Sequence, residues 1–130
     1  TDKTLMPKIL LAEDNELNRD MLSRRLQRRG YDVVIAADGQ QAVAKSASEC
    51  PDLLLLDVGL PIIDGLEVAR RIRSDPQLCS LPILGLSAHA MQGDKERALA
   101  AGCDDYDTKP IDIERLLAKI NCLLQASHER

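Results

Sequence analysis

Several polar residues of this sequence directly follow apolar or mixed runs, at positions from which they could act together. In chain order these residues are Glu13, Asp14, Asp57, Ser87 and Lys109. If the runs are neighbouring parallel strands, their carboxyl ends share one edge of the sheet, where ligands bind in open α/β folds. Three carboxylates, a hydroxyl and an ammonium would then line one pocket.

Such a pocket requires a cation, because carboxylates packed together raise one another's proton affinity unless a positive charge lies between them. Mg²⁺ is commonly held by one or two carboxylates, retained waters and a phosphate oxygen. The pattern therefore indicates a Mg²⁺-dependent site that handles a phosphoryl group. Single residues have simpler interpretations. Asp57 alone could be a turn residue, and Glu13 and Glu16 could be helix-start acids favoured by the helix dipole.

Alternating strand and helix patterns would position these residues. The run Leu53–Leu56 is apolar throughout, as expected for a central parallel strand covered on both faces. Strands are predicted at 8–12, 31–36, 52–57, 82–87 and 104–108. Helices are predicted at 16–29, 39–48, 65–74, 91–101 and 112–125. The first helix should present one apolar stripe of Leu17, Met21, Leu22 and Leu26, and Asp112 should cap the last.

The order of these elements predicts an α/β fold. Right-handed crossovers give a five-stranded parallel, doubly wound sheet with five helices. The flavodoxin-like strand order 2-1-3-4-5, a known arrangement of such sheets, is the expected one. The 130 residues suffice for one domain, predicted at 8–124 between a flexible N-terminal extension, 1–7, and a flexible tail, 125–130. Either Met6 is the native start, or the sequence was part of a longer protein.

Composition excludes several classes of function. The chain is 45% hydrophobic but only 2% aromatic, so its core must consist of aliphatic side chains. A formal charge of −4 argues against direct binding to nucleic acid. No apolar stretch is long enough to span a membrane, and no secretory signal is visible, so a cytoplasmic protein is predicted. The cysteines lack the close pairs of zinc sites, and reduced, mostly buried thiols are expected at Cys50, Cys79, Cys103 and Cys122.

The order of the polar residues resembles that of a known family. Glu13-Asp14, Asp57, Ser87 and Lys109-Pro110 follow one another as in the receiver domains of two-component response regulators, the CheY-like family. Supporting stretches are 60–65 and 101–106, and the resemblance covers about 8–124. The segments 13–18 and 92–97 are similar to stand-alone DivK-like regulators and to receivers of hybrid histidine kinases.

The resemblance implies a role for each residue around the acceptor. Asp57 would be the phosphoacceptor, whose carboxylate attacks a phosphoryl group and forms an acyl phosphate. Asp14, Asp57 and the backbone carbonyl of Gly59 would bind Mg²⁺ directly, and Glu13 through a water. Gly59 and His89 would flank the path of the hydrolytic water, with most of the modulation falling on His89.

The resemblance also implies the residues that read the phosphoryl group. Lys109 would pair with its oxygens, and the bond between Lys109 and Pro110 would be cis, which X-Pro peptides tolerate. The Ser87 hydroxyl would donate to the phosphoryl group, and Tyr106 would be the aromatic switch residue. A surface lysine and a half-buried strand tyrosine are the alternative interpretations.

The predicted function is that of a signalling switch and not of an enzyme acting on outside substrates. It would take phosphate from a histidine kinase or a histidine phosphotransfer protein and change a surface for a downstream target, built from 91–101, 104–108 and 112–125. A receiver excised from a hybrid histidine kinase is an alternative. A Mg²⁺-dependent aspartyl phosphotransferase is less favoured, because haloacid-dehalogenase-type enzymes need an aspartate where Gly59 stands. A nucleotide- or flavin-binding site is set aside, because the acidic segment 13–16 would repel the phosphate of such a ligand.

Overall fold

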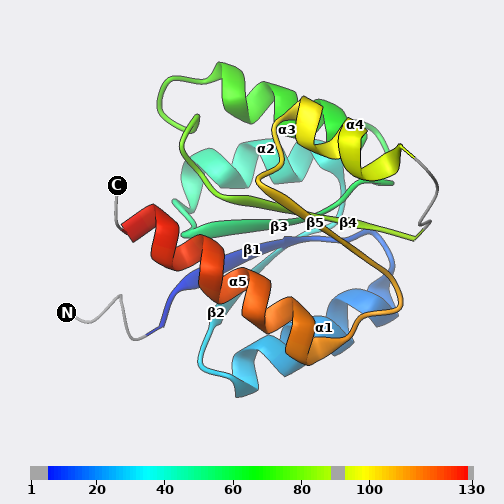
Figure 1. Ribbon diagram of the computed structural model, residues 1–130, viewed down its shortest axis with the longest axis vertical. Helices are drawn as coiled ribbons and strands as arrows, with labels where there is room; N and C mark the ends of the chain where they lie inside the picture. The colour runs from blue at the N-terminus through cyan, green and yellow to red at the C-terminus, as the bar shows by residue number, and fades with distance from the viewer. Residues whose placement is uncertain (1–5, 89–92, 129–130) are drawn as a thin grey trace.

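Strands and helices alternate along the whole described chain (Figure 1). The computed structural model describes residues 6–88 and 93–128. The strands are β1 (Lys8–Ala12), β2 (Asp32–Ala36), β3 (Leu53–Asp57), β4 (Ile83–Ser87) and β5 (Asp105–Thr108). The helices are α1 (Glu16–Arg28), α2 (Gly39–Ser48), α3 (Gly65–Ser74), α4 (Asp94–Ala101) and α5 (Ile113–His128). The predicted elements are confirmed within the described residues, with α5 running past the expected end at residue 125. Positions 91 and 92 of the fourth predicted helix lie outside the described residues.

The strands form one parallel sheet in the order β2-β1-β3-β4-β5, as predicted. Helices α1 and α5 cover one face, and α2, α3 and α4 cover the other (Figure 1). The register pairs Ala12 with Leu56 and Asp57 with Leu86. Residues just beyond β1 therefore lie next to the end of β3, so the topology alone brings Glu13 close to Asp57.

Two apolar clusters, one on each face of the sheet, form the core. Successive leucines of β3 alternate between them, Leu54 and Leu56 on the α2–α4 side and Leu53 and Leu55 on the α1–α5 side. All four are fully buried, and burying each stabilises the fold by roughly 1.5–3 kcal/mol. The strand that presents Asp57 is thus anchored on both faces.

Helix α1 differs from the predicted single stripe. Leu22 and Leu26 are buried, but Leu17 and Met21 are 79% and 53% exposed. A helix turns by about 100° per residue, which places Leu17 about 140° from Leu22. Leu17 and Met21 therefore lie on one face of α1 and Leu22 and Leu26 on another. Only the face of Leu22 and Leu26 packs on the sheet.

Side-chain caps fix the starts of several helices. Asn15, Asp38 and Asp64 each accept a hydrogen bond from the backbone N–H three residues later. Asp112 accepts one from the Arg115 N–H at 3.2 Å, which confirms the predicted cap of α5. The caps therefore fix the loops that lead from a strand into α1, α2, α3 and α5. These loops lie at the carboxyl edge of the sheet, where the candidate site lies.

The cysteine prediction is wrong in one respect. All four thiols are free, but only Cys103 is buried, whereas Cys50, Cys79 and Cys122 are exposed. The three exposed thiols lie in helix-end or connecting segments or on the outer face of α5, which the alternation of elements did not reveal. Desolvation raises the pKa of Cys103 to about 11.

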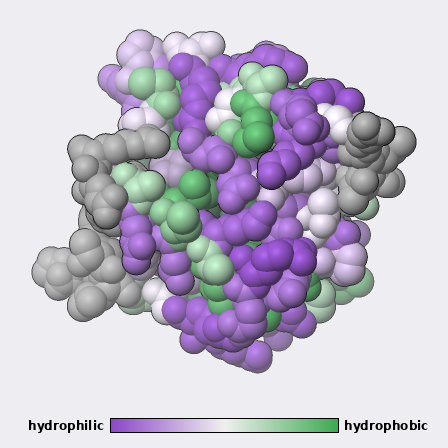
Figure 2. All heavy atoms as spheres, in the orientation of Figure 1, coloured by the Kyte–Doolittle hydropathy of each residue, from purple (hydrophilic) through white to green (hydrophobic). Residues whose placement is uncertain are grey.

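The described surface is mainly hydrophilic. On the face drawn in Figure 2, apolar side chains form small patches separated by polar ones. None of the helices in 6–88 and 93–128 combines the length and apolarity needed to cross a bilayer.

Candidate functional site

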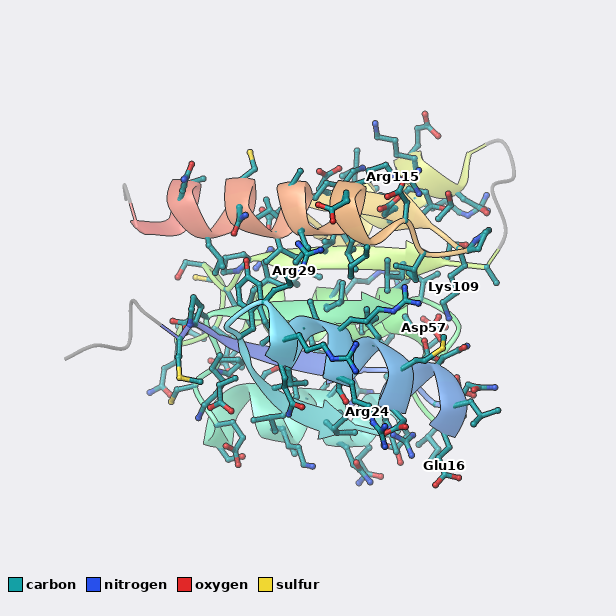
Figure 3. The ribbon with its side chains drawn as sticks, turned by 90° about the horizontal axis from the view of Figure 1, so that it is seen from below. Glu16, Arg24, Arg29, Asp57, Lys109 and Arg115 are labelled. Atoms are coloured by element: carbon teal, nitrogen blue, oxygen red, sulfur yellow. The ribbon has the colours of Figure 1, made fainter. Side chains whose placement is uncertain are left out.

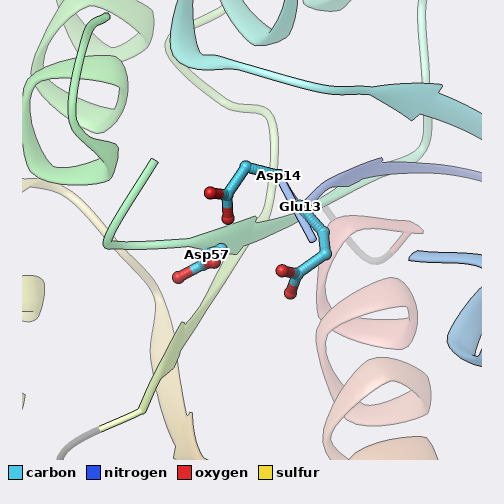
Figure 4. A group of neighbouring side chains, drawn as sticks. All are labelled: Glu13, Asp14 and Asp57. Carbon is cyan, nitrogen blue, oxygen red and sulfur yellow. The ribbon is translucent and has the colours of Figure 1, made fainter. Parts of the chain in front are cut away.

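Three carboxylates converge at the carboxyl edge of the sheet (Figure 4). One oxygen from each of Glu13, Asp14 and Asp57 lies within 4.8 Å of the others. Glu13 and Asp57 are only 2% and 7% exposed, whereas Asp14 is exposed. An all-oxygen donor set of this size, open to solvent on one side, fits a hard divalent cation such as Mg²⁺.

The ammonium of Lys109 joins this group, as the sequence predicted (Figure 3). Its Nζ lies 2.8 Å from Glu13 Oε1 and 3.4 Å from Asp57 Oδ2. Burial alone lowers the pKa of Lys109, but the hydrogen bond and the charges from Glu13 and Asp57 outweigh it and raise the pKa above its ordinary value. Lys109 is therefore the counter-charge of two of the three carboxylates. The peptide bond between Lys109 and Pro110 is cis.

Ser87 and Tyr106 lie on the neighbouring strands. Ser87 ends β4 one residue beyond the partner of Asp57, and it is 4% exposed. Tyr106 lies on β5 and is already buried, at 8% exposure. Ser87 and Tyr106 contribute to the wall of one cavity of about 280 Å³ that also reaches α4. A change at Ser87 can thus reach the packing of Tyr106 and α4.

The Asp57 carboxylate borders open space on the side of Gly59. The backbone N–H of Gly59 donates to Asp57 Oδ1 at 2.9 Å, and a side chain added at Gly59 would start 3.6 Å from that oxygen. Position 59 therefore has room for a larger residue. His89, the second predicted modulator, lies outside the described residues.

Two glycines and one arginine shape the loops around the site. A Cβ at Gly39 would lie 1.8 Å from the Ile63 carbonyl oxygen, so only glycine lets the loop after β3 approach α2. A Cβ at Gly65 would lie 2.4 Å from Val58 Cα. Arg19 Nη1 donates to the Glu13 and Asp14 carbonyl oxygens at 3.0 and 3.4 Å. Of these contacts, the approach of Gly39 to Ile63 joins segments far apart in sequence, which a local sequence pattern cannot indicate.

Comparison with known proteins identifies the architecture. Residues 9–121 match the family described as response regulator receiver domain. The chain belongs to this family. It is a receiver domain of two-component signalling, and the match confirms the resemblance inferred from the sequence.

Relatives of this receiver domain occur both alone and within longer chains. It is 36% identical to the polar-differentiation response regulator DivK of Brucella anthropi, over 92% of this chain and 98% of DivK. It is 40% identical to the transcriptional regulator RpaA of Synechocystis, over 92% of this chain but only 50% of RpaA. The chain therefore spans half of one such relative and nearly all of another.

Solved structures agree with this assignment. The receiver domain of a sensor histidine kinase from Pseudomonas aeruginosa PAO1 is 37% identical and superimposes with a TM-score of 0.86, covering 92% of this chain and 98% of that one. That structure has a magnesium ion coordinated in its active-site cleft. The chemotaxis protein CheY4 of Vibrio cholerae is 33% identical, with a TM-score of 0.84, covering 91% of this chain and 98% of that one.

Proposed function

We propose that Asp57 of this receiver domain accepts a phosphoryl group from a histidine kinase or a histidine phosphotransfer protein. The observation that carries the proposal is the meeting of Asp57 with Glu13, Asp14 and Lys109 at the end of a strand buried on both faces. The buried strand gives the carboxylate a fixed position, and the charges around it suit an incoming phosphoryl group. The receiver of the hybrid signal transduction histidine kinase I of Dictyostelium discoideum, 42% identical to this chain, makes a role inside a longer relay protein an alternative.

The transfer forms a bond between an Asp57 carboxylate oxygen and phosphorus while the phosphorus–nitrogen bond of the donor histidine breaks. The electron pair of that bond returns to the imidazole. Gly59 N–H holds Oδ1 of Asp57, and Lys109 lies against Oδ2. The carboxylate is thereby oriented before the donor arrives, which lowers the entropic cost of the reaction.

Asp14, Asp57 and the Gly59 carbonyl would hold Mg²⁺, with Glu13 acting through a water. The cation would offset the repulsion between the carboxylates and an anionic donor. Lys109 would then leave Glu13 for the phosphoryl oxygens, and the Ser87 hydroxyl would donate to them. Hydrolysis would be modulated at positions 59 and 89. The chain promotes only its own phosphorylation and dephosphorylation.

Output should follow from the cavity that Ser87 shares with Tyr106 and α4. A phosphoryl group adds roughly −1.5 to −2 charges and strong acceptor oxygens. Drawing Ser87 toward it would alter the packing of Tyr106, which lies between α4 and α5 on the sheet. The downstream partner would therefore bind at α4, β5 and α5.

The test is direct labelling. Incubation with a small phosphodonor and Mg²⁺ should add one phosphoryl unit, seen in the intact mass, and chelation of Mg²⁺ should prevent it. Asp57→Asn should remain unlabelled, whereas Asp20→Asn, which changes an exposed carboxylate of α1 paired with Arg24, should label normally. Equal labelling of Asp57→Asn would refute the assignment.

A further inference from the structure

A third carboxylate of the described residues is buried, and it has no part in the acceptor pocket. Asp107 on β5 is 5% exposed, comparable to Glu13 and Asp57. Its neighbour Tyr106 packs in the cluster on the α2–α4 side, so Asp107 faces the opposite side of the sheet, the side of α1 and α5. A carboxylate in such surroundings must be paired, because its burial is otherwise costly.

The partner of Asp107 is Arg115 in the first turn of α5. Arg115 Nε lies 2.9 Å from Asp107 Oδ1 and 3.2 Å from Oδ2. The Thr108 N–H donates to the same carboxylate at 2.8 Å. Arg115 is also held by Asp112, which accepts from its backbone N–H and lies 3.9 Å from its guanidinium. The pair therefore ties β5 firmly to the start of α5.

The segment enclosed by this tie contains Lys109. The Lys109 N–H bonds to the Ser87 carbonyl oxygen at 2.8 Å, and the next backbone bond joins Leu116 N–H to Asp112. Between them, neither Ile111 nor Asp112 donates a backbone–backbone hydrogen bond to another described residue. Side-chain contacts therefore hold this loop, namely the Asp107–Arg115 pair and the packing of Ile111 and Ile113 on the core. At the start of the loop, the Lys109 ammonium lies 2.8 Å from Glu13.

Stability alone does not account for the pair. The Arg115 side chain is 45% exposed, and an ion pair with a solvent-exposed partner contributes little to stability. The face that Asp107 occupies is lined mainly by apolar side chains, so an apolar residue would suit it. What an apolar pair would not reproduce is the directional bond from the guanidinium across the loop.

We propose that Asp107 and Arg115 are positioning residues for Lys109, a role that rests on the proposed phosphorylation of Asp57. Their ion pair closes the loop from β5 to α5 and so fixes where the Lys109 backbone leaves the sheet. The ammonium is thereby placed to meet the phosphoryl oxygens. Figure 3 shows Arg115 at the same end of the molecule as Lys109 and Asp57.

The first test compares the wild type with the double variant Asp107→Leu/Arg115→Met, chosen so that the fold is kept. At saturating Mg²⁺ and phosphodonor, its rate of Asp57 phosphorylation should fall about tenfold, because a misplaced group loses catalytic effect steeply. Its Mg²⁺ affinity should not weaken, since the proposed ligands lie on other loops. Arg115→Lys should recover part of the rate. Arg29→Gln removes the 2.6 Å bond from Arg29, the C-cap of α1, to Glu114 of α5 but leaves the loop closed, so it should behave as wild type.

A double-mutant cycle separates positioning from general damage. In a Lys109→Ala background, replacing the pair should cause no further loss of rate, because the residue that it positions is absent. A loss of equal size in both backgrounds, or an unchanged rate in the double variant, would overturn the proposal. Failure of the wild type to label at all would instead count against the proposed function.

One readout needs no phosphorylation. In the wild type and in Arg29→Gln, the side-chain nitrogen resonance of Lys109 should show its hydrogen bond to Glu13. In Asp107→Leu/Arg115→Met that hydrogen bond should be lost. If it persists, the pair does not position Lys109, whatever the labelling shows.

Discussion

At the scale of single residues, Lys109 has two roles that oppose each other. Its ammonium contacts Glu13 and Asp57, two of the three carboxylates that would surround a cation. It therefore stabilises the cation-free pocket and competes with Mg²⁺ for the same negative charge. The same ammonium should be needed once a phosphoryl group arrives. A substitution at this position should separate the two roles.

Lys109→Met should bind Mg²⁺ more tightly, by about tenfold, because a positive charge beside the carboxylates has been removed. Its Asp57 should nevertheless be phosphorylated more slowly. The two effects can be measured by calorimetric titration of Mg²⁺ and by the rate of labelling. Weaker Mg²⁺ binding in Lys109→Met would show that the ammonium organises the carboxylates and does not compete for them.

The same variant gives a pH dependence. The folded-state pKa of Lys109 is raised, so its contribution to the free energy of unfolding is fully present below the ordinary value of 10.5. It is lost as the pH rises through the raised pKa. The difference in unfolding free energy between wild type and Lys109→Met should therefore be flat between about pH 6 and 9 and shrink in more alkaline solution.

At the scale of elements, α4 is the helix best placed to respond to the site. It packs through small residues, Ala98 and Ala101, and its Leu99 is 40% exposed. Its first residue follows Gly93, which provides no side-chain cap. Such a shallow contact resists displacement less than the packing of α3, which buries Val68, Ala69 and Ile72. Helix α4 also borders the cavity shared by Ser87 and Tyr106.

Binding of a beryllofluoride phosphate mimic should therefore shift amide resonances in 93–101 and 105–108 and in the first turns of α5. Helix α2 covers the same face of the sheet as α4 but lies near the opposite edge, so it provides the internal control. Its resonances should change little beyond Gly39, which touches the loop after β3. The shifts in α4 should be reduced in Lys109→Met. Shifts confined to the neighbourhood of Asp57 would place the output surface elsewhere.

At the scale of the whole molecule, the predictability of each feature follows from how local its cause is. The run Leu53–Leu56 indicated a doubly covered strand because burial on both faces removes every polar residue. Parallel topology then placed Glu13 beside Asp57 without further information. The prediction placed the apolar residues of α1 on one face because Leu17 and Leu22 are equally hydrophobic. They differ only in the direction in which they project from the helix.

Other features could not be predicted because they depend on distant partners. The need for glycine at position 39 arises from the Ile63 carbonyl, which only the folded loop brings near. The Asp107–Arg115 pair crosses a loop whose path the sequence does not specify. In the sequence alone, Asp107 is one of several acids before Lys109, and nothing local distinguishes it as buried.

The charge of the pocket should affect the stability of the entire fold, with a sign that depends on the cation. Without Mg²⁺, Asp14 adds its charge beside Glu13 and Asp57, which Lys109 already pairs. Asp14→Asn should therefore be more stable than wild type, because one repulsive charge is gone. A cation that binds only the folded state adds stability, about 2.7 kcal/mol at a concentration 100 times its dissociation constant. This gain should be large in wild type and small in Asp14→Asn, so Mg²⁺ should reverse the order of stability. Urea unfolding with and without Mg²⁺ measures both effects. Asp20→Asn, which removes an exposed acid of α1, should show no reversal. An equal gain from Mg²⁺ in Asp14→Asn and wild type would mean that Asp14 does not bind the cation.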